Sequence, residues 1–159
     1  MTDYDHKTQK GRPYPAYTYA AQIVKLSINE ETGKVDVLRV VVAQDVGRAI
    51  NPNLVEGQLE GSIVMGIGWV LQEIFVPGKT ESFATYHIPR SDAVPEIKMV
   101  LIESNEPGAP FGAKGVGEAA MVPTAPAMLN AIANATGIRF YEVPIDSNRL
   151  KQRNLFHNS

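Results

Sequence analysis

A glycine-rich segment at residues 108–120 is the part of the sequence best suited to chemistry. It reads Gly-Ala-Pro-Phe-Gly-Ala-Lys-Gly-Val-Gly-Glu-Ala-Ala and leads into a stretch with helical spacing. Glycines leave backbone N–H groups accessible and allow left-handed turns, so such a loop before a helix can surround an anionic or polar ligand. Glu118 lies at the end of the loop, with little side chain around it to block a ligand.

Two phosphate-binding motifs are excluded for this loop. Residues 115–120 formally satisfy the dinucleotide fingerprint, but that fold needs a strand running straight into the turn, and the loop here is long. Glu118 would also place a carboxylate where a pyrophosphate should bind. Lys114 is followed by Gly115 rather than by Ser or Thr, which excludes the ATP-type phosphate loop.

Glu118 is a candidate for proton transfer. A ligand that covered its carboxylate would favour the neutral form by desolvation, whereas a helix N-terminus beside it would favour the charged form. A carboxylate whose charge is balanced in this way can act as a general base. From the residues alone, an ordinary carboxylate at the start of a helix remains the alternative.

The other polar residues carry weaker signals. Gln58 lies between Gly57 and Gly61, where its amide could bind a planar polar ligand. Glu56 and Glu60 lie one turn apart, which fits a solvated helix face as well as an acid pair. Three histidines share no metal-ligand spacing: His6, His87 and His157. The sequence has no Gly-x-Ser-x-Gly motif, so a serine hydrolase has no support.

The composition excludes several further classes of site. The 159 residues suffice for one domain. They include no cysteine, which excludes disulfides, cysteine-based zinc sites, iron–sulfur ligation and thiol nucleophiles. Lys and Arg number 15 against 17 Asp and Glu, so no electrostatic case for nucleic acid or an anionic membrane follows. Redox chemistry here would require a cofactor that takes no sulfur ligand from this chain.

No targeting signal is evident. Residues 1–12 are polar and lack the apolar core of a signal peptide. The longest apolar run, residues 63–71, is far shorter than the roughly 20 residues that cross a bilayer. A cytoplasmic location is therefore expected.

The elements that position these residues begin with a predicted β-hairpin. Alternating apolar residues predict strands at 17–29 and 34–46, joined by a turn in which Gly33 suits a left-handed position. The solid apolar run at residues 40–43 predicts a strand buried on both faces.

A helix is predicted from the Asn51-Pro52 start to about residue 73. Four glycines within it each cost roughly 1 kcal/mol relative to alanine. They are Gly57, Gly61, Gly66 and Gly68. This cost predicts a close backbone approach, which tight helix-on-sheet packing explains as well as a ligand does.

The second half of the chain completes a ββαβαβ order. Its predicted elements are a short strand and loops at 75–93, a strand at 96–103, a helix at 118–136 stopped by Gly137, and a strand at 138–143. Pro123 and Pro126 allow the helix at 118–136 to start as late as Thr124. A short C-terminal helix would follow, capped by Asp146 or Ser147.

This order predicts an α+β fold with a mixed β-sheet and helices packed on it. We expect residues 1–16 to be a flexible tail or linker, 17–152 the domain, and 153–159 a polar tail.

Two blocks of residues occur in an order and at a separation typical of one family. The first comprises residues 44–52 (Gln-Asp-Val-Gly-Arg-Ala-Ile-Asn-Pro), 56–61 (Glu-Gly-Gln-Leu-Glu-Gly) and 66–68 (Gly-Ile-Gly). The second is residues 111–118 (Phe-Gly-Ala-Lys-Gly-Val-Gly-Glu). Together they resemble the C-terminal part of the molybdenum-binding subunit of the xanthine dehydrogenase and aldehyde oxidase family, the molybdenum hydroxylases. The resemblance covers about residues 13–152.

The resemblance implies a molybdopterin cofactor that provides the sulfur ligands of the metal itself, so that no residue of this chain binds the metal. It implies that Glu118 is the base that takes a proton from the hydroxyl group attacking an electron-poor carbon of the substrate. Gln58 would hydrogen-bond the pterin, and Phe111 and Gly112 would lie in the substrate pocket. Backbone contacts to the cofactor would come from Lys114, Gly115, Val116 and Gly117.

The resemblance also implies a larger enzyme. The remaining segments of the molybdenum subunit would complete the site, and partner chains would carry iron–sulfur clusters and FAD. The loop variant at residues 110–118 is similar to that of bacterial xanthine dehydrogenase-like and nicotinate dehydrogenase-like members. A purine or another N-heterocycle is then the expected substrate, and the isolated chain is expected to be inactive. The alternatives are an aldehyde-oxidising member and a non-catalytic structural or assembly subunit.

Overall fold

The chain forms a three-stranded mixed sheet in the part that the computed structural model describes, residues 4–11, 13–14 and 16–151. The strands are β1 (Ala20–Ile28), β2 (Val35–Asp45) and β3 (Glu96–Ile102), in that order across the sheet. β1 pairs with β2 antiparallel, and β2 pairs with β3 parallel. The α+β class with a mixed sheet is therefore confirmed; the tail expected at 153–159 lies outside the described residues.

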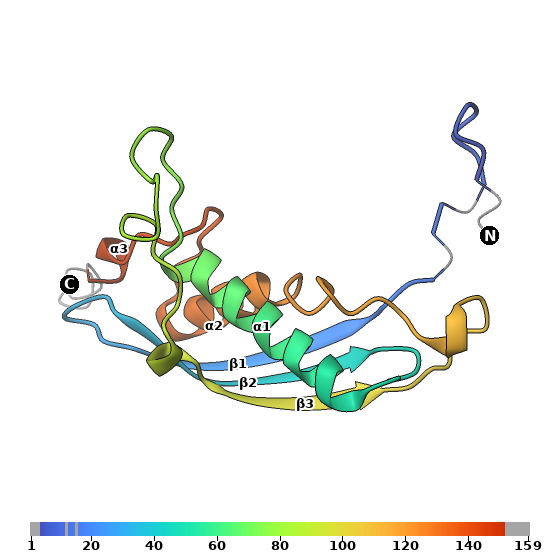
Figure 1. Cartoon of the computed structure of the whole chain (residues 1–159). Coiled ribbons are helices and arrows are strands. Elements are labelled where there is room, and N and C mark those ends of the chain that lie inside the picture. Colours follow the sequence, from blue (N-terminus) through green and yellow to red (C-terminus); the bar gives the residue numbers. More distant parts are fainter. Residues whose placement is uncertain (1–3, 12, 15, 152–159) are drawn as a thin grey trace.

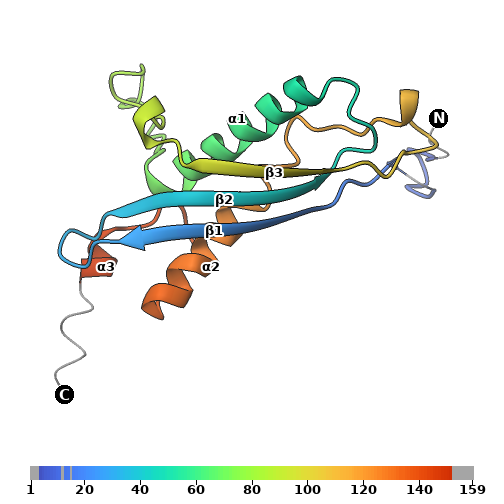
Figure 2. The ribbon, with the colours of Figure 1, turned by 90° about the horizontal axis from the view of Figure 1, so that it is seen from below.

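Two long helices cover one face of this sheet. Helix α1 (Pro52–Leu71) forms the crossover between β2 and β3, and α2 (Thr124–Thr136) packs beside it (Figure 1). A short helix, α3 (Asn148–Lys151), ends the described region. The view from below shows the opposite face of the sheet without a covering helix (Figure 2). Among the described residues, no helix is long and apolar enough to span a membrane.

The core lies between the sheet and the two helices. Its buried members come from β2, α1, α2 and the C-terminal segment: Val40, Val42, Ile63, Ile67, Val70, Met128, Ile132, Phe140, Ile145 and Leu150. On the opposite face of β2, Val41 and Ala43 are only half-buried. The prediction that the apolar run is buried on both faces is therefore correct for the helix side alone.

Local signals placed the ends of several elements correctly. The Asn51 side chain accepts a hydrogen bond of 3.2 Å from the backbone N–H of Leu54, which caps α1. Gly33 and Gly137 have left-handed φ angles of +71° and +75° in the hairpin turn and at the end of α2. The backbone N–H of Asn148 donates to the carboxylate of Asp146, one of the two residues predicted to cap the last helix.

Three predicted elements differ in the structure. Helix α2 begins at Thr124, because residues 118–123 form consecutive turns ahead of the proline-containing first turn. Residues 138–143 form no strand: the chain crosses the end of α1, where the backbone N–H of Ile145 donates to the Val70 carbonyl. Residues 75–93 contain turns and the 3-10 helix Ser91–Ala93 but no strand.

The four glycines of α1 fall into two groups. A Cβ atom on Gly66 would lie 2.7 Å from Cβ of Thr124 in α2, and one on Gly68 would lie 2.8 Å from Cδ of Pro89. A Cβ atom on Gly57 or Gly61 would meet nothing within 4 Å in the described part of the chain. Internal packing therefore explains Gly66 and Gly68, and it does not explain the other two.

We predict that Gly66→Ala lowers the free energy of unfolding by about 1–3 kcal/mol, because the added methyl group overpacks the contact with Thr124. The matched variant Gly61→Ala should raise it by up to about 1 kcal/mol, because alanine favours the helix and meets no neighbour. Urea unfolding of both variants measures the difference. A stabilising Gly66→Ala would contradict the close contact.

Candidate functional site

The glycine-rich loop folds against the turn that follows β2. The backbone N–H of Asn105 donates to the Gly47 carbonyl at 2.9 Å, and that of Lys114 donates to the Val46 carbonyl at 2.9 Å. Gly47 has a φ of +68°, and a Cβ atom on it would lie 2.9 Å from the Lys114 backbone nitrogen. Only glycine allows this turn and this approach together. The loop is thus fixed at both ends beside the end of β2.

The Lys114 side chain points into the protein. Its ammonium donates to Asp45 Oδ2 at 2.7 Å and to the Tyr17 carbonyl at 2.8 Å, and 7% of the side chain is exposed. A second carboxylate oxygen, Oε2 of Glu106, lies 3.9 Å away. The side chain therefore holds the loop in place against the end of β2.

Asp45 accepts hydrogen bonds on both carboxylate oxygens. Ser104 Oγ donates to Oδ1 at 2.8 Å and the Gly47 backbone N–H donates to the same oxygen at 3.0 Å, while Lys114 binds Oδ2. Burial by itself raises the pKa of this carboxyl group, but the hydrogen bonds from Lys114, Gly47 and Ser104 outweigh burial and hold the pKa below its ordinary value. Asp45 is therefore ionised throughout the neutral range.

A cavity of about 340 Å³ lies between the first half of α1 and this loop. Its lining residues are Val46, Arg48, Ile50, Asn51, Leu54, Val55, Gln58, Ala113, Lys114 and Val116. Three of the residues predicted to bind a cofactor, Gln58, Lys114 and Val116, thus meet at one cavity although they are far apart in the sequence. The Gln58 amide has no hydrogen-bond partner within the described ranges.

The other predicted site residues lie around this cavity or outside it. Gly115 and Gly117 are exposed, and a Cβ atom on either would meet nothing within 4 Å. Phe111 does not line the cavity: it is 81% exposed and has a left-handed φ of +54°. Gly112 is buried against Asn105 instead. The structure does not bring Phe111 and Gly112 together with Gln58.

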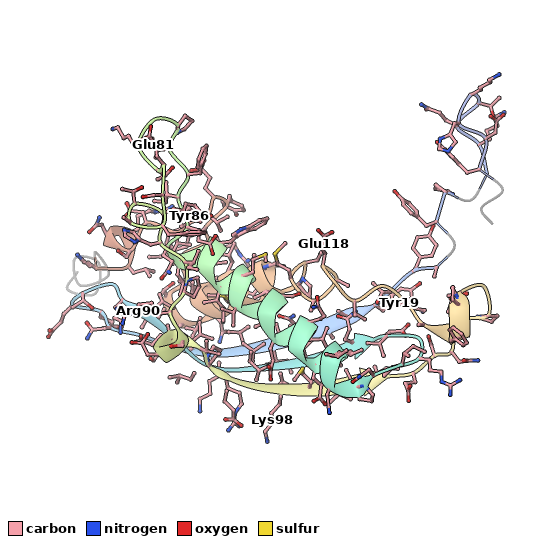
Figure 3. All side chains as sticks on the ribbon, viewed as in Figure 1. Tyr19, Glu81, Tyr86, Arg90, Lys98 and Glu118 are labelled. Atoms are coloured by element: carbon pink, nitrogen blue, oxygen red, sulfur yellow. The ribbon has the colours of Figure 1, made fainter. Side chains whose placement is uncertain are left out.

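Glu118 projects from the loop beside α1. The Ser62 hydroxyl lies 3.0 Å from the Gly117 carbonyl oxygen and 2.8 Å from that of Gln58, so the residue before Glu118 is fixed one turn from Gln58. The Glu118 side chain is exposed and points away from the sheet (Figure 3). Its carboxylate has no hydrogen bond or ion pair to any residue that the structure describes.

Sequence reasoning missed the residues that hold this loop. Asp45 lies within the first resembling block but carried no predicted role, and neither Tyr17 nor Ser104 was singled out. A buried partner for Lys114 was the only available signal, since a lysine within a glycine-rich loop must either reach solvent or find an acceptor.

Comparison with known proteins identifies the fold and its relatives. Residues 1–95 match the family described as molybdopterin cofactor-binding domain. The chain is 32% identical over 145 residues to a xanthine dehydrogenase molybdenum-binding subunit of Escherichia coli, covering 87% of this chain and 19% of the relative. It is 37% identical over 138 residues to a nicotinate dehydrogenase subunit of Pseudomonas putida, covering 84% of this chain and 11% of that protein.

Solved structures agree with these matches. Aldehyde oxidoreductase from Desulfovibrio gigas superposes with a TM-score of 0.87 at 28% identity, covering 96% of this chain and 17% of that one. Quinoline 2-oxidoreductase from Pseudomonas putida 86 gives a TM-score of 0.72 at 28% identity, covering 84% of this chain and 18% of that one. The chain thus spans about a fifth or less of the length of the relatives it matches.

We predict that Asp45 makes stability depend on pH. Because its pKa is lowered on folding, its contribution is complete above the unfolded-state pKa of about 3.9 and is lost as the pH falls through the folded-state value. The unfolding free energy should therefore fall below about pH 4. Asp45→Asn should remove this pH dependence. It should also lower the unfolding free energy at pH 7 by about 3–5 kcal/mol, because it leaves Lys114 buried without its counter-ion.

Urea unfolding between pH 2.5 and pH 7 measures this dependence. Asp36→Asn is the control, because Asp36 lies on the same strand and pairs with Lys34 in an exposed ion pair. The control should change stability by less than about 1 kcal/mol. Equal effects of the two substitutions would contradict the role of the buried pair.

Proposed function

Because this chain belongs to the molybdopterin cofactor-binding domain family, we propose that it forms one wall of the active site of a molybdenum hydroxylase. Such an enzyme hydroxylates an electron-poor carbon with oxygen from water. The cavity lined by Gln58, Lys114 and Val116, with the exposed carboxylate of Glu118 two residues beyond Val116 and without a partner among the described residues, is the observation that carries the proposal.

The residues at this cavity fit a large planar cofactor with polar edges. Gly115 and Gly117 leave their backbone uncovered, and the Gln58 amide has both donors and an acceptor free of partners in the described part of the chain. The cavity of about 340 Å³ offers one surface for such a group. Other segments of a full-length subunit would enclose the rest, in agreement with the much greater length of the relatives.

Each residue then has a defined task. The Gln58 amide would hydrogen-bond the pterin, and the backbone N–H groups of residues 115–117 would donate to its polar edge. The bound cofactor would supply the two-electron oxidation of the substrate. The Glu118 carboxylate would accept, on one of its oxygens, the proton that the attacking hydroxyl group gives up. Lys114 would keep this loop in position through its buried side chain.

A purine or another N-heterocycle is the substrate class that we propose. The similarity to the nicotinate dehydrogenase of Pseudomonas putida, at 37% identity, supports a heterocycle. An aldehyde is the second candidate, supported by the TM-score of 0.87 with an aldehyde oxidoreductase. The ratio of kcat/KM for nicotinate or xanthine to that for benzaldehyde in the assembled enzyme would distinguish the two classes.

We propose that the partners are the remaining molybdenum-subunit segments and chains carrying iron–sulfur clusters and FAD. Several relatives are named as subunits of larger assemblies, including a 6-hydroxypseudooxynicotine dehydrogenase complex. A non-catalytic structural or assembly subunit is the remaining alternative. It predicts a complex whose activity does not depend on Glu118.

We predict that Glu118→Gln in the assembled enzyme lowers kcat by roughly 100- to 10 000-fold, because the amide cannot accept the proton. The molybdenum content should not change, since the side chain is exposed and holds no other residue in the described region. Steady-state turnover and metal analysis measure the two quantities. The control Glu142→Gln makes the same change at another exposed glutamate and should keep full turnover. Near-normal turnover of fully loaded Glu118→Gln would refute the assignment.

We also predict that the purified 159-residue chain alone has no hydroxylase activity, because it provides only one wall of the cavity. Oxidation of xanthine, nicotinate or benzaldehyde by the isolated chain, together with bound molybdenum after gel filtration, would contradict this.

A further inference from the structure

Both ends of the loop that carries the proposed site converge on one carboxylate. Ser104, at the start of the loop, donates to Asp45 Oδ1, and Lys114, near its end, donates to Oδ2. The side chain of Asp45 is 9% exposed. One buried side chain at the end of β2, together with the backbone hydrogen bonds from Asn105 to Gly47 and from Lys114 to Val46, therefore joins the two ends of the segment 104–114.

The backbone of Asp45 is fixed independently of this loop. Its N–H donates to the Tyr19 carbonyl at 2.8 Å, and its carbonyl accepts from the Thr18 hydroxyl. The segment that leads into β1 thus holds the backbone, and the Tyr17 carbonyl in the same segment completes the partners of Lys114. Asp45 is anchored to the sheet while its carboxylate holds the loop.

We infer that Asp45 is a positioning residue, whose carboxylate sets the place of residues 113–117 against α1 and thereby that of Glu118. The inference rests on the proposed function for its catalytic consequence. The clamp itself, by which we mean the contacts of Asp45 with Ser104 and Lys114, is a property of the chain alone. Asp45 does not line the cavity, so it acts on a ligand only through the loop.

Two substitutions would release the two ends of the loop separately. In Asp45→Asn the amide oxygen can still accept from Ser104, but the NH2 group faces the Lys114 ammonium, so two donors oppose each other. Ser104→Ala removes the Oδ1 contact at the start of the loop and leaves the ion pair intact. Because Ser104 is exposed and uncharged, its variant does not leave a buried charge unpaired.

Hydrogen exchange of the 159-residue chain, read by NMR at single amides, tests the clamp without any cofactor. Asp45→Asn should speed exchange of the Lys114 amide by about tenfold or more relative to the amides of β1 and β2. Ser104→Ala should speed exchange of the Asn105 and Glu106 amides and leave the Lys114 amide protected. The control Asp36→Asn, on the same strand, should change none of them. The inference would be overturned if the Lys114 amide of Asp45→Asn, or the Asn105 and Glu106 amides of Ser104→Ala, exchanged as slowly as in the wild type.

Kinetics of the assembled enzyme then separates positioning from general support of the fold. Asp45→Asn should lower kcat per bound molybdenum at least several-fold and leave KM and the metal content within about twofold. Ser104→Ala leaves the Lys114 ion pair intact and should keep kcat per molybdenum within about twofold. Faster exchange at the Lys114 amide of Asp45→Asn with unchanged kcat per molybdenum, or a loss of bound metal alone, would overturn the positioning role. Full turnover in Glu118→Gln would refute the proposed base instead, and the exchange results would still decide the clamp.

Discussion

The buried ion pair between Lys114 and Asp45 is the constraint on which the rest of the site depends. A charge that is removed from water is tolerated only when every polar atom around it has a partner. The ammonium needs the Tyr17 carbonyl as well as the carboxylate, and the carboxylate needs Ser104 and Gly47. Four separate stretches of chain must therefore be correctly placed at once, and the cavity beside them takes its shape from that requirement.

Much of the fold could be predicted from local signals. The Asn51 cap, the left-handed Gly33 and the stop at Gly137 each depend on the conformation of a few neighbouring residues, and the structure confirms all three. The predicted strand at 138–143 was wrong because Phe140 packs into the core while Tyr141 and Val143 are exposed, and the local apolar pattern does not distinguish this packing from a strand. The late start of α2 depends on turns at 118–123 that the prolines permit but do not dictate.

Less of the site could be predicted from the sequence, because its organisation depends on distant contacts. The two resembling blocks contained Gln58, Lys114 and Val116, which line one cavity in the structure. They gave no indication that the Lys114 ammonium is buried against Asp45, since that depends on where β2 ends. The glycines of α1 were equally ambiguous in the sequence. Only the tertiary structure shows that Gly66 packs against Thr124, whereas Gly57 and Gly61 contact no neighbour in the described part of the chain.

The clamp also determines when the site forms during folding. Tyr17 and Lys114 are 97 residues apart, and Asp45 and Lys114 are 69 apart. Contacts across such separations carry a high entropic cost of loop closure and form slowly, after the hairpin and the helices have brought their ends together. We therefore expect the loop to be among the last parts of the chain to become ordered, so that the wall of the cavity it forms is completed late in folding.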